Sequence, residues 1–131
     1  MTRVLHGSCL CGATLYNVAD DFKYALICHC SQCRRATGSA FKPFGGIERF
    51  HLKVKKGRLK IYGDVVRHNA NCITCGSLLY SIIEKMAHVT YGTLLDAPTL
   101  QPQAHIFVGS KATWDVICDS LPQHMEFPPK G

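Results

Sequence analysis

The sequence predicts one domain, residues 1–131, built mainly from short β-strands with little helix. Three observations support this prediction. Apolar and polar residues alternate over many short stretches, and no segment shows the sustained 3.6-residue period of a helical bundle. In addition, 47% of the 131 residues are hydrophobic, which is enough apolar material for one core and excludes global disorder.

The expected strands can be justified in chain order. Alternation or a short apolar run predicts strands at 13–18, 24–27, 40–46, 50–54, 59–62, 78–83, 88–93 and 105–108. We expect 40–46 at a sheet edge, because Pro43 has no N–H to donate to a ladder. We expect 50–54 and 59–62 to pair as a hairpin across the basic turn 55–58.

One helix and one aromatic anchor complete the expected fold. Residues 31–37 predict a helix of one or two turns, capped by Ser31 and ended by Gly38. We expect Trp114 to belong to the core rather than to a ligand cage.

Cysteine usage is the most informative feature of the composition. The chain has eight cysteines, and seven of them lie in three tight clusters. The clusters are a C-x-C at Cys9 and Cys11, a C-x-C-x-x-C at Cys28, Cys30 and Cys33, and a C-x-x-C at Cys72 and Cys75. Such spacings suit metal chelation better than disulfides, because residues i and i+2 of an extended segment point to the same side.

The number of thiolates bears on the number of zinc ions. A structural zinc takes four ligands, whereas a catalytic zinc keeps one position open, so seven thiols favour four plus three. One arrangement joins Cys9 and Cys11 with Cys72 and Cys75 and leaves the triplet whole. The alternative is a single structural zinc between the triplet region and the last doublet, with the first doublet spare. Spacing alone leaves both arrangements open.

Charge and hydropathy limit the partners. The formal net charge is +6, but ionising seven thiols and binding two Zn²⁺ would lower it to about +3. We therefore expect no nucleic-acid partner despite a pI near 9.0. No apolar run is long enough for a membrane helix, and the N-terminus does not resemble a secretory signal. We expect a cytoplasmic protein with reduced thiols and no membrane partner.

Three segments carry a family resemblance. They are Gly7-Ser8-Cys9-Leu10-Cys11-Gly12, the run from Cys28-His29-Cys30-Ser31-Gln32-Cys33 through Phe41, and Cys72-Ile73-Thr74-Cys75-Gly76. Together with His105 to Trp114, they resemble the glutathione-dependent formaldehyde-activating enzyme family, which also includes centromere protein V. The resemblance implies an Mss4-like, zinc-stabilised fold of short antiparallel strands.

The resemblance also implies a function and a set of ligands. Cys9, Cys11, Cys72 and Cys75 match the structural zinc ligands, and Cys28, Cys30 and Cys33 match the ligands of a second, catalytic zinc. The implied reaction is addition of glutathione, or another thiol, to formaldehyde, giving S-hydroxymethylglutathione by a carbon–sulfur lyase type of enzyme. The alternatives are a zinc-stabilised binding or scaffold module and a thiol redox protein.

Three residues beside the triplet invite separate predictions. Arg34 and Arg35 are candidates for binding a substrate carboxylate, because a guanidinium pairs with a carboxylate through two hydrogen bonds. His29 lies between two expected ligands. In an extended C-x-C its ring points away from the sulfurs, so we expect a packing or surface role. The alternative is a role as general acid or base, or as a fourth ligand.

Overall fold

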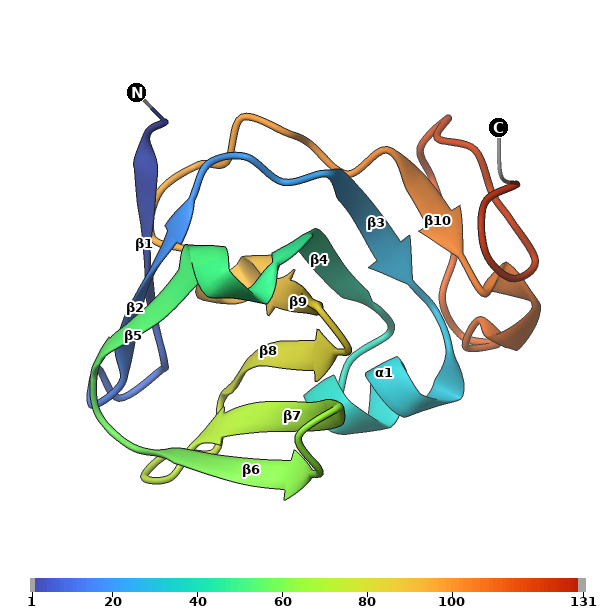
Figure 1. Cartoon of the computed structure of the whole chain (residues 1–131). Helices are drawn as coiled ribbons and strands as arrows, with labels where there is room; N and C mark the ends of the chain where they lie inside the picture. Colours follow the sequence, from blue (N-terminus) through green and yellow to red (C-terminus); the bar gives the residue numbers. More distant parts are fainter. Residues whose placement is uncertain (1, 130–131) are drawn as a thin grey trace.

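The computed structural model describes residues 2–129, in which two β-sheets and one short α-helix form the fold (Figure 1). The smaller sheet is antiparallel, with the strand order β1 (Val4–Ser8), β2 (Leu15–Ala19), β5 (Leu52–Lys56). This architecture confirms the prediction of a mainly β fold with little helix.

The larger sheet has seven strands. Their spatial order is β10 (Ala104–Ile106), β3 (Tyr24–Cys28), β4 (Lys42–Glu48), β9 (Met86–Thr90), β8 (Leu78–Ile83), β7 (Arg67–Cys72) and β6 (Leu59–Gly63). All neighbours pair antiparallel except β10 and β3, which are parallel. The helices are α1 (Ser31–Thr37) and three 3-10 turns at Arg49–His51, Tyr91–Thr93 and Val108–Ser110.

The main core lies where the two sheets share apolar side chains. Leu5 and Tyr16 of the small sheet belong to one buried cluster with Ile47, Leu79 and Val89 of the large sheet. Within β2 and β9, buried residues alternate with half-buried ones, as expected for strands with one face on the core. Cys9 and Cys72, which belong to the first and last cysteine doublets, also lie in this cluster. The core therefore extends to a candidate metal site.

The prediction that 40–46 is an edge strand is wrong. Strand β4 lies inside the large sheet, between β3 and β9. Pro43 is tolerated because it lies at the start of the strand, where it faces Ile27 of β3, and pairing with β9 begins only at Phe44. At Pro43 the strand therefore has a partner on one side only.

The predicted hairpin of 50–54 and 59–62 is also wrong. Strand β5 pairs with β2 in the small sheet, whereas β6 pairs with β7 in the large one. The turn between them carries the chain from one sheet to the other. Alternation along each segment predicts that it is a strand, but it does not specify the strand with which it pairs.

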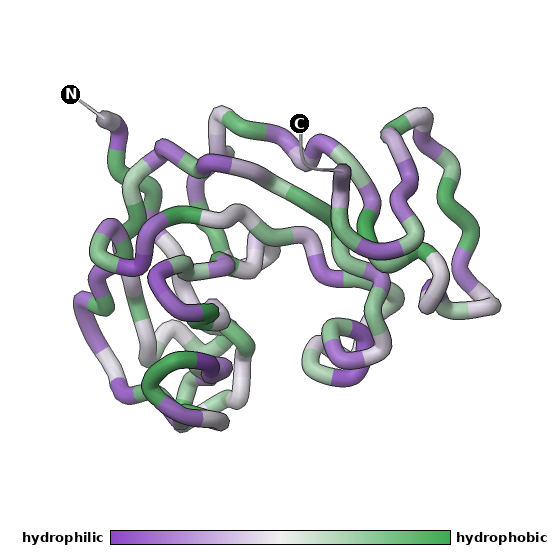
Figure 2. The backbone as a smooth tube through the Cα atoms, turned by 45° about the vertical axis from the view of Figure 1, so that its right-hand side comes forward, coloured by the Kyte–Doolittle hydropathy of each residue, from purple (hydrophilic) through white to green (hydrophobic). Residues whose placement is uncertain are grey.

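Smaller predictions had mixed outcomes. The helix at 31–37 is confirmed and ends at Gly38, but its N-cap is Cys30 rather than Ser31. The core role expected for Trp114 is wrong, since its exposure is 71%. Hydrophobic and hydrophilic residues interchange over short distances along the chain (Figure 2), and no helix among the described residues is long and apolar enough to span a membrane.

Candidate metal centres and cavity

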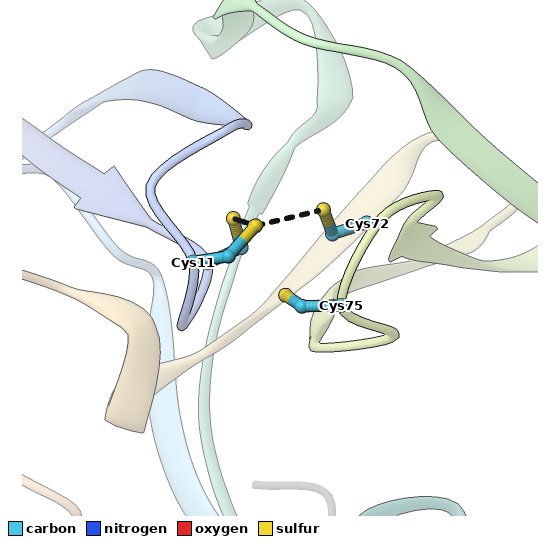
Figure 3. Close-up of side chains that lie close together, drawn as sticks. Cys11, Cys72 and Cys75 are labelled. Carbon is cyan, nitrogen blue, oxygen red and sulfur yellow. Dashed lines mark hydrogen bonds between the residues drawn. The ribbon is translucent and has the colours of Figure 1, made fainter.

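Four cysteines from two turns meet at one point. Cys9 and Cys11 lie in the turn between β1 and β2, and Cys72 and Cys75 lie at the turn between β7 and β8. Their sulfur atoms all lie within 4.8 Å of one another, with 3.6 Å between Cys9 and Cys11 and 4.0 Å between Cys11 and Cys72 (Figure 3). The structure thus brings together the first and last cysteine doublets.

This cluster fits a tetrahedral metal ion. Metal–sulfur bonds of about 2.3 Å place the sulfurs of a tetrahedron about 3.8 Å apart, close to the distances found here. The arrangement with Cys9 and Cys11 spare is not the one that the fold adopts.

Backbone geometry prepares the two turns for thiolates. The Thr14 amide donates to Sγ of Cys9 at 3.2 Å, and Gly12 and Gly76 close the turns with φ of 78° and 84°. Hydrogen bonds from Ser77 lower the pKa of the Cys75 thiol to about 5. Hydrogen bonds to the thiolate favour the form that binds a metal ion.

The other three clustered cysteines form a second candidate centre. Cys28 ends β3, Cys30 caps α1, and Cys33 lies in the first turn of that helix. Their sulfur atoms all lie within 4.8 Å of one another. The Cys30 sulfur accepts a hydrogen bond from the Cys33 amide at 3.3 Å, so the cap that starts the helix also fixes the cluster.

Cys28 and Cys33 differ in their ease of ionisation. The pKa of Cys33 is lowered to about 6, mainly by a hydrogen bond from Cys28. Burial opposes this effect, and the positive charge of Lys42 adds to it. The same hydrogen bond and burial raise the pKa of Cys28. Cys33 is therefore a thiolate at neutral pH before any metal binds.

A cavity of about 630 Å³ opens onto the three-cysteine cluster. Its walls come from the β3–α1 junction, from β7 and β8, and from a residue near the C-terminus, and they include Arg67, His68 and Phe127. Among residues 2–129, no aspartate and no glutamate lines the cavity. Apart from the thiols, its charged groups are therefore cations, which favours an anionic ligand.

Lys42 is the unusual residue of this cavity. It is only 6% exposed, and its ammonium group lies 5.4 Å from the centre of the Phe44 ring. No carboxylate within residues 2–129 comes within ion-pair distance of it. A buried cation without a carboxylate partner is stabilised by another anion. The thiolate forms of the adjacent cysteines are placed to supply that negative charge.

His88 adds a neutral wall to the same cavity. Burial, with a smaller contribution from Lys42, lowers its pKa to about 4. Its ring stacks on Phe44 at 4.5 Å, and its Nε2 lies 2.7 Å from the Tyr24 hydroxyl. At neutral pH the imidazole is uncharged, so it can donate or accept a hydrogen bond but does not compete with Lys42 for an anion.

The predicted arginines lie apart from this cavity. Arg34 is half-buried on α1 and Arg35 is exposed, and neither lines the cavity. Sequence reasoning missed Lys42 and Arg67 as cavity residues. A single lysine within the aromatic run Phe41-Lys42-Pro43-Phe44 is a signal that could have identified the first, whereas nothing local marks the second.

Comparison with known proteins identifies the family of the chain. The family model of the glutathione-dependent formaldehyde-activating enzymes matches residues 4–110. The chain belongs to this family. Residues 111–129, the C-terminal segment, lie beyond the matched region.

A solved structure supports the fold. The crystal structure of a Rhodobacter sphaeroides protein aligns with a TM-score of 0.58 and 24% sequence identity, over 72% of this chain and 91% of that chain. At this level of identity the likeness concerns the fold alone. No curated protein matches the chain at a significant level.

Proposed function

We propose that this protein condenses glutathione, or a similar anionic thiol, with formaldehyde to give the S-hydroxymethyl adduct. In the opposite direction the reaction breaks a carbon–sulfur bond, which makes the enzyme a carbon–sulfur lyase. Membership of the formaldehyde-activating family supports this chemistry. The observation that carries the proposal is the three-cysteine cluster in the wall of a 630 Å³ cavity.

We propose zinc at both cysteine clusters, with different roles. Cys9, Cys11, Cys72 and Cys75 would provide all four ligands of a structural zinc, because four thiolates complete a tetrahedron. Cys28, Cys30 and Cys33 would provide three ligands of the second. A zinc ion there supplies an open coordination position that favours the ionised form of an incoming thiol.

The chain's own residues assist the addition. The sulfur forms a bond to the aldehyde carbon, the carbonyl π-electrons move to oxygen, and that oxygen takes up the proton released by the thiol. Lys42 lies in the cavity wall, where its ammonium can stabilise the negative charge that develops on oxygen. Burial makes this interaction stronger than it would be in water.

Cavity charge supports an anionic thiol. Of the residues that the structure describes, Lys42 and Arg67 are the fixed cations of the lining, and none of them places a carboxylate there to compete with a substrate. Glutathione carries two carboxylates and fits this requirement. A neutral thiol of similar size would leave Lys42 without a partner beyond the cluster itself.

Thiol redox chemistry is the second candidate, and one observation favours it. In the metal-free protein the pKa of Cys33 is lowered to about 6, and Cys28 lies beside it with a raised pKa. A reactive thiolate next to a second thiol is the arrangement of a redox dithiol. Reversible oxidation accompanied by metal loss would support this reading over the lyase.

The test is an assay of glutathione consumption with formaldehyde, using protein of verified zinc content. We expect activity in the wild-type protein and its loss in Cys30→Ser, in which serine keeps the helix cap but removes a thiolate ligand. Cys118→Ser is the matched control, because Cys118 is exposed and lies outside both clusters. Full activity in Cys30→Ser would refute the proposed site.

A further inference from the structure

A chain of hydrogen bonds, buried at its two histidines and exposed at Asp119, runs from the three-cysteine loop to the C-terminal segment. Nε2 of His29 lies 2.8 Å from Nδ1 of His105, and Nε2 of His105 lies 3.0 Å from both carboxylate oxygens of Asp119. His29 is 0% exposed and His105 is 3% exposed. Three separate parts of the chain thus meet in one polar network.

The position of His29 links this network to the metal ligands. His29 lies between Cys28 and Cys30, and its amide donates to the carbonyl of Ile106 at 3.0 Å. The loop is therefore held to β10 by a backbone bond and a side-chain bond at the same residue. A shift of His29 would displace both neighbouring sulfur atoms.

His29 is not placed to be a ligand itself. The ligand atoms within 4.8 Å of one another in this cluster are the three sulfurs, and no ring nitrogen belongs to the group. Its role is to act through the loop that it belongs to.

Asp119 comes from the C-terminal segment, which pairs with the free edge of β10. The His105 amide donates to the Pro122 carbonyl, and the His124 amide donates to the His105 carbonyl, both at 2.9 Å. In Figure 1 this segment lies beside β10, on the side away from β3. The hydrogen bond from His105 favours ionised Asp119 and lowers its pKa.

Burying two imidazoles costs desolvation free energy, which their hydrogen bonds offset only where every polar atom has a partner. Apolar side chains would fill the same space without a desolvation cost, and Nδ1 of His29 has no hydrogen-bond partner among the described residues. What the histidines provide and apolar side chains could not is a directional link. The carboxylate can only accept, so it fixes which ring nitrogen of His105 donates.

We propose that Asp119, His105 and His29 are positioning residues that hold the three-cysteine loop in its metal-binding geometry. The C-terminal segment lies outside the family match, and through Asp119 it then helps to position the metal ligands. The inference rests on the metal site of the proposed function, but not on the reaction. Loss of such outer support lowers metal affinity about 10- to 100-fold in other proteins.

The experiment measures metal release from intact zinc-loaded protein challenged with a chromophoric chelator. Two sites give two phases, and Cys30→Ser identifies the phase of the three-cysteine site. In Asp119→Ala we expect that phase to be about 10- to 100-fold faster and the other phase to be unchanged. Asp119→Asn keeps an acceptor oxygen for His105 and should restore slow release.

A matched control and a second readout make the test specific. Asp96→Ala removes a carboxylate that lies 2.8 Å from Nδ1 of His6 on β1, so it breaks a similar pair that has no link to the three-cysteine loop. It should leave that phase unchanged. Imidazole ¹⁵N shifts of His29 and His105 should change in Asp119→Ala but not in Asp96→Ala.

The outcomes separate this inference from the proposed function. Unchanged release from the three-cysteine site in Asp119→Ala would overturn the inference and leave the metal site intact. Equal acceleration of both phases would also overturn it, because it would indicate general loosening of the fold. A wild-type protein that holds one metal ion would refute the three-cysteine site itself, and the inference with it.

Discussion

Replacing Lys42 by methionine tests the electrostatics of the cavity most sharply. Methionine has a similar length and volume but no charge, so it suits a position that is only 6% exposed. A centre of three thiolates and Zn²⁺ carries a net charge of −1, and Lys42 is the buried cation of the cavity that contains it. The substitution leaves that negative charge uncompensated.

The size of the effect follows from Coulomb's law. As an order-of-magnitude estimate, two unit charges taken to be about 6 Å apart, at an effective dielectric constant of about 20, interact with about 3 kcal/mol. That energy corresponds to about a 100-fold change in an equilibrium constant. We therefore expect Lys42→Met to weaken zinc binding at the three-cysteine site by about 10- to 100-fold. In the metal-free protein it should raise the pKa of Cys33 above about 6, because the charge of Lys42 lowers that pKa.

The assay is chelator competition, with iodoacetamide labelling of Cys33 followed against pH. Lys42→Arg keeps the charge and should stay close to wild type, and Lys55→Met removes an exposed lysine from β5 as the matched control. Zinc affinity and labelling midpoint both unchanged in Lys42→Met would refute the electrostatic argument. They would mean that solvent or another group neutralises the cluster.

Two further predictions concern stability. The free energy of unfolding of the metal-free protein should fall as the pH drops from about 9 to about 5, because Cys33 and Cys75 have pKa values of about 6 and about 5 in the folded state and ordinary values when unfolded. A flat profile in urea unfolding would contradict this. Gly57→Ala should cost about 2–4 kcal/mol, because φ is 91° and the new Cβ would lie 2.3 Å from the Ala13 carbonyl oxygen. Gly92→Ala, whose Cβ would meet no atom within 4 Å, is the control.

Local patterns predicted most of the strands, although residues 50–51 and 91–93, expected in strands, form 3-10 turns. They predicted the pairing between strands less well. The segments 13–18, 24–27 and 78–83 are strands, with boundaries shifted by up to two residues. The position of β4 and the separation of β5 from β6 were not predictable from alternation. Pairing partners depend on the whole sheet arrangement, which a stretch of a few residues does not encode.

The site divides in the same way. Cysteine spacing indicated metal chelation but left open whether there are one or two centres. The family resemblance indicated how the doublets pair, and the fold brings the four cysteines of these two doublets together. The cavity could not be predicted, because its lining comes from segments far apart in the sequence. Lys42 lies on β4, Arg67 on β7 and Phe127 near the C-terminus. The bond between His29 and His105 spans 76 positions and has no local signature.

Metal content per chain is the most direct test of the central claim, the three-cysteine metal site. Elemental analysis of untagged protein, purified without chelator, should give two zinc ions per chain in the wild type. It should give one in Cys30→Ser, which keeps the four-cysteine cluster. One zinc per chain in both proteins would contradict the account, because the three cysteines beside the cavity would then hold no metal ion.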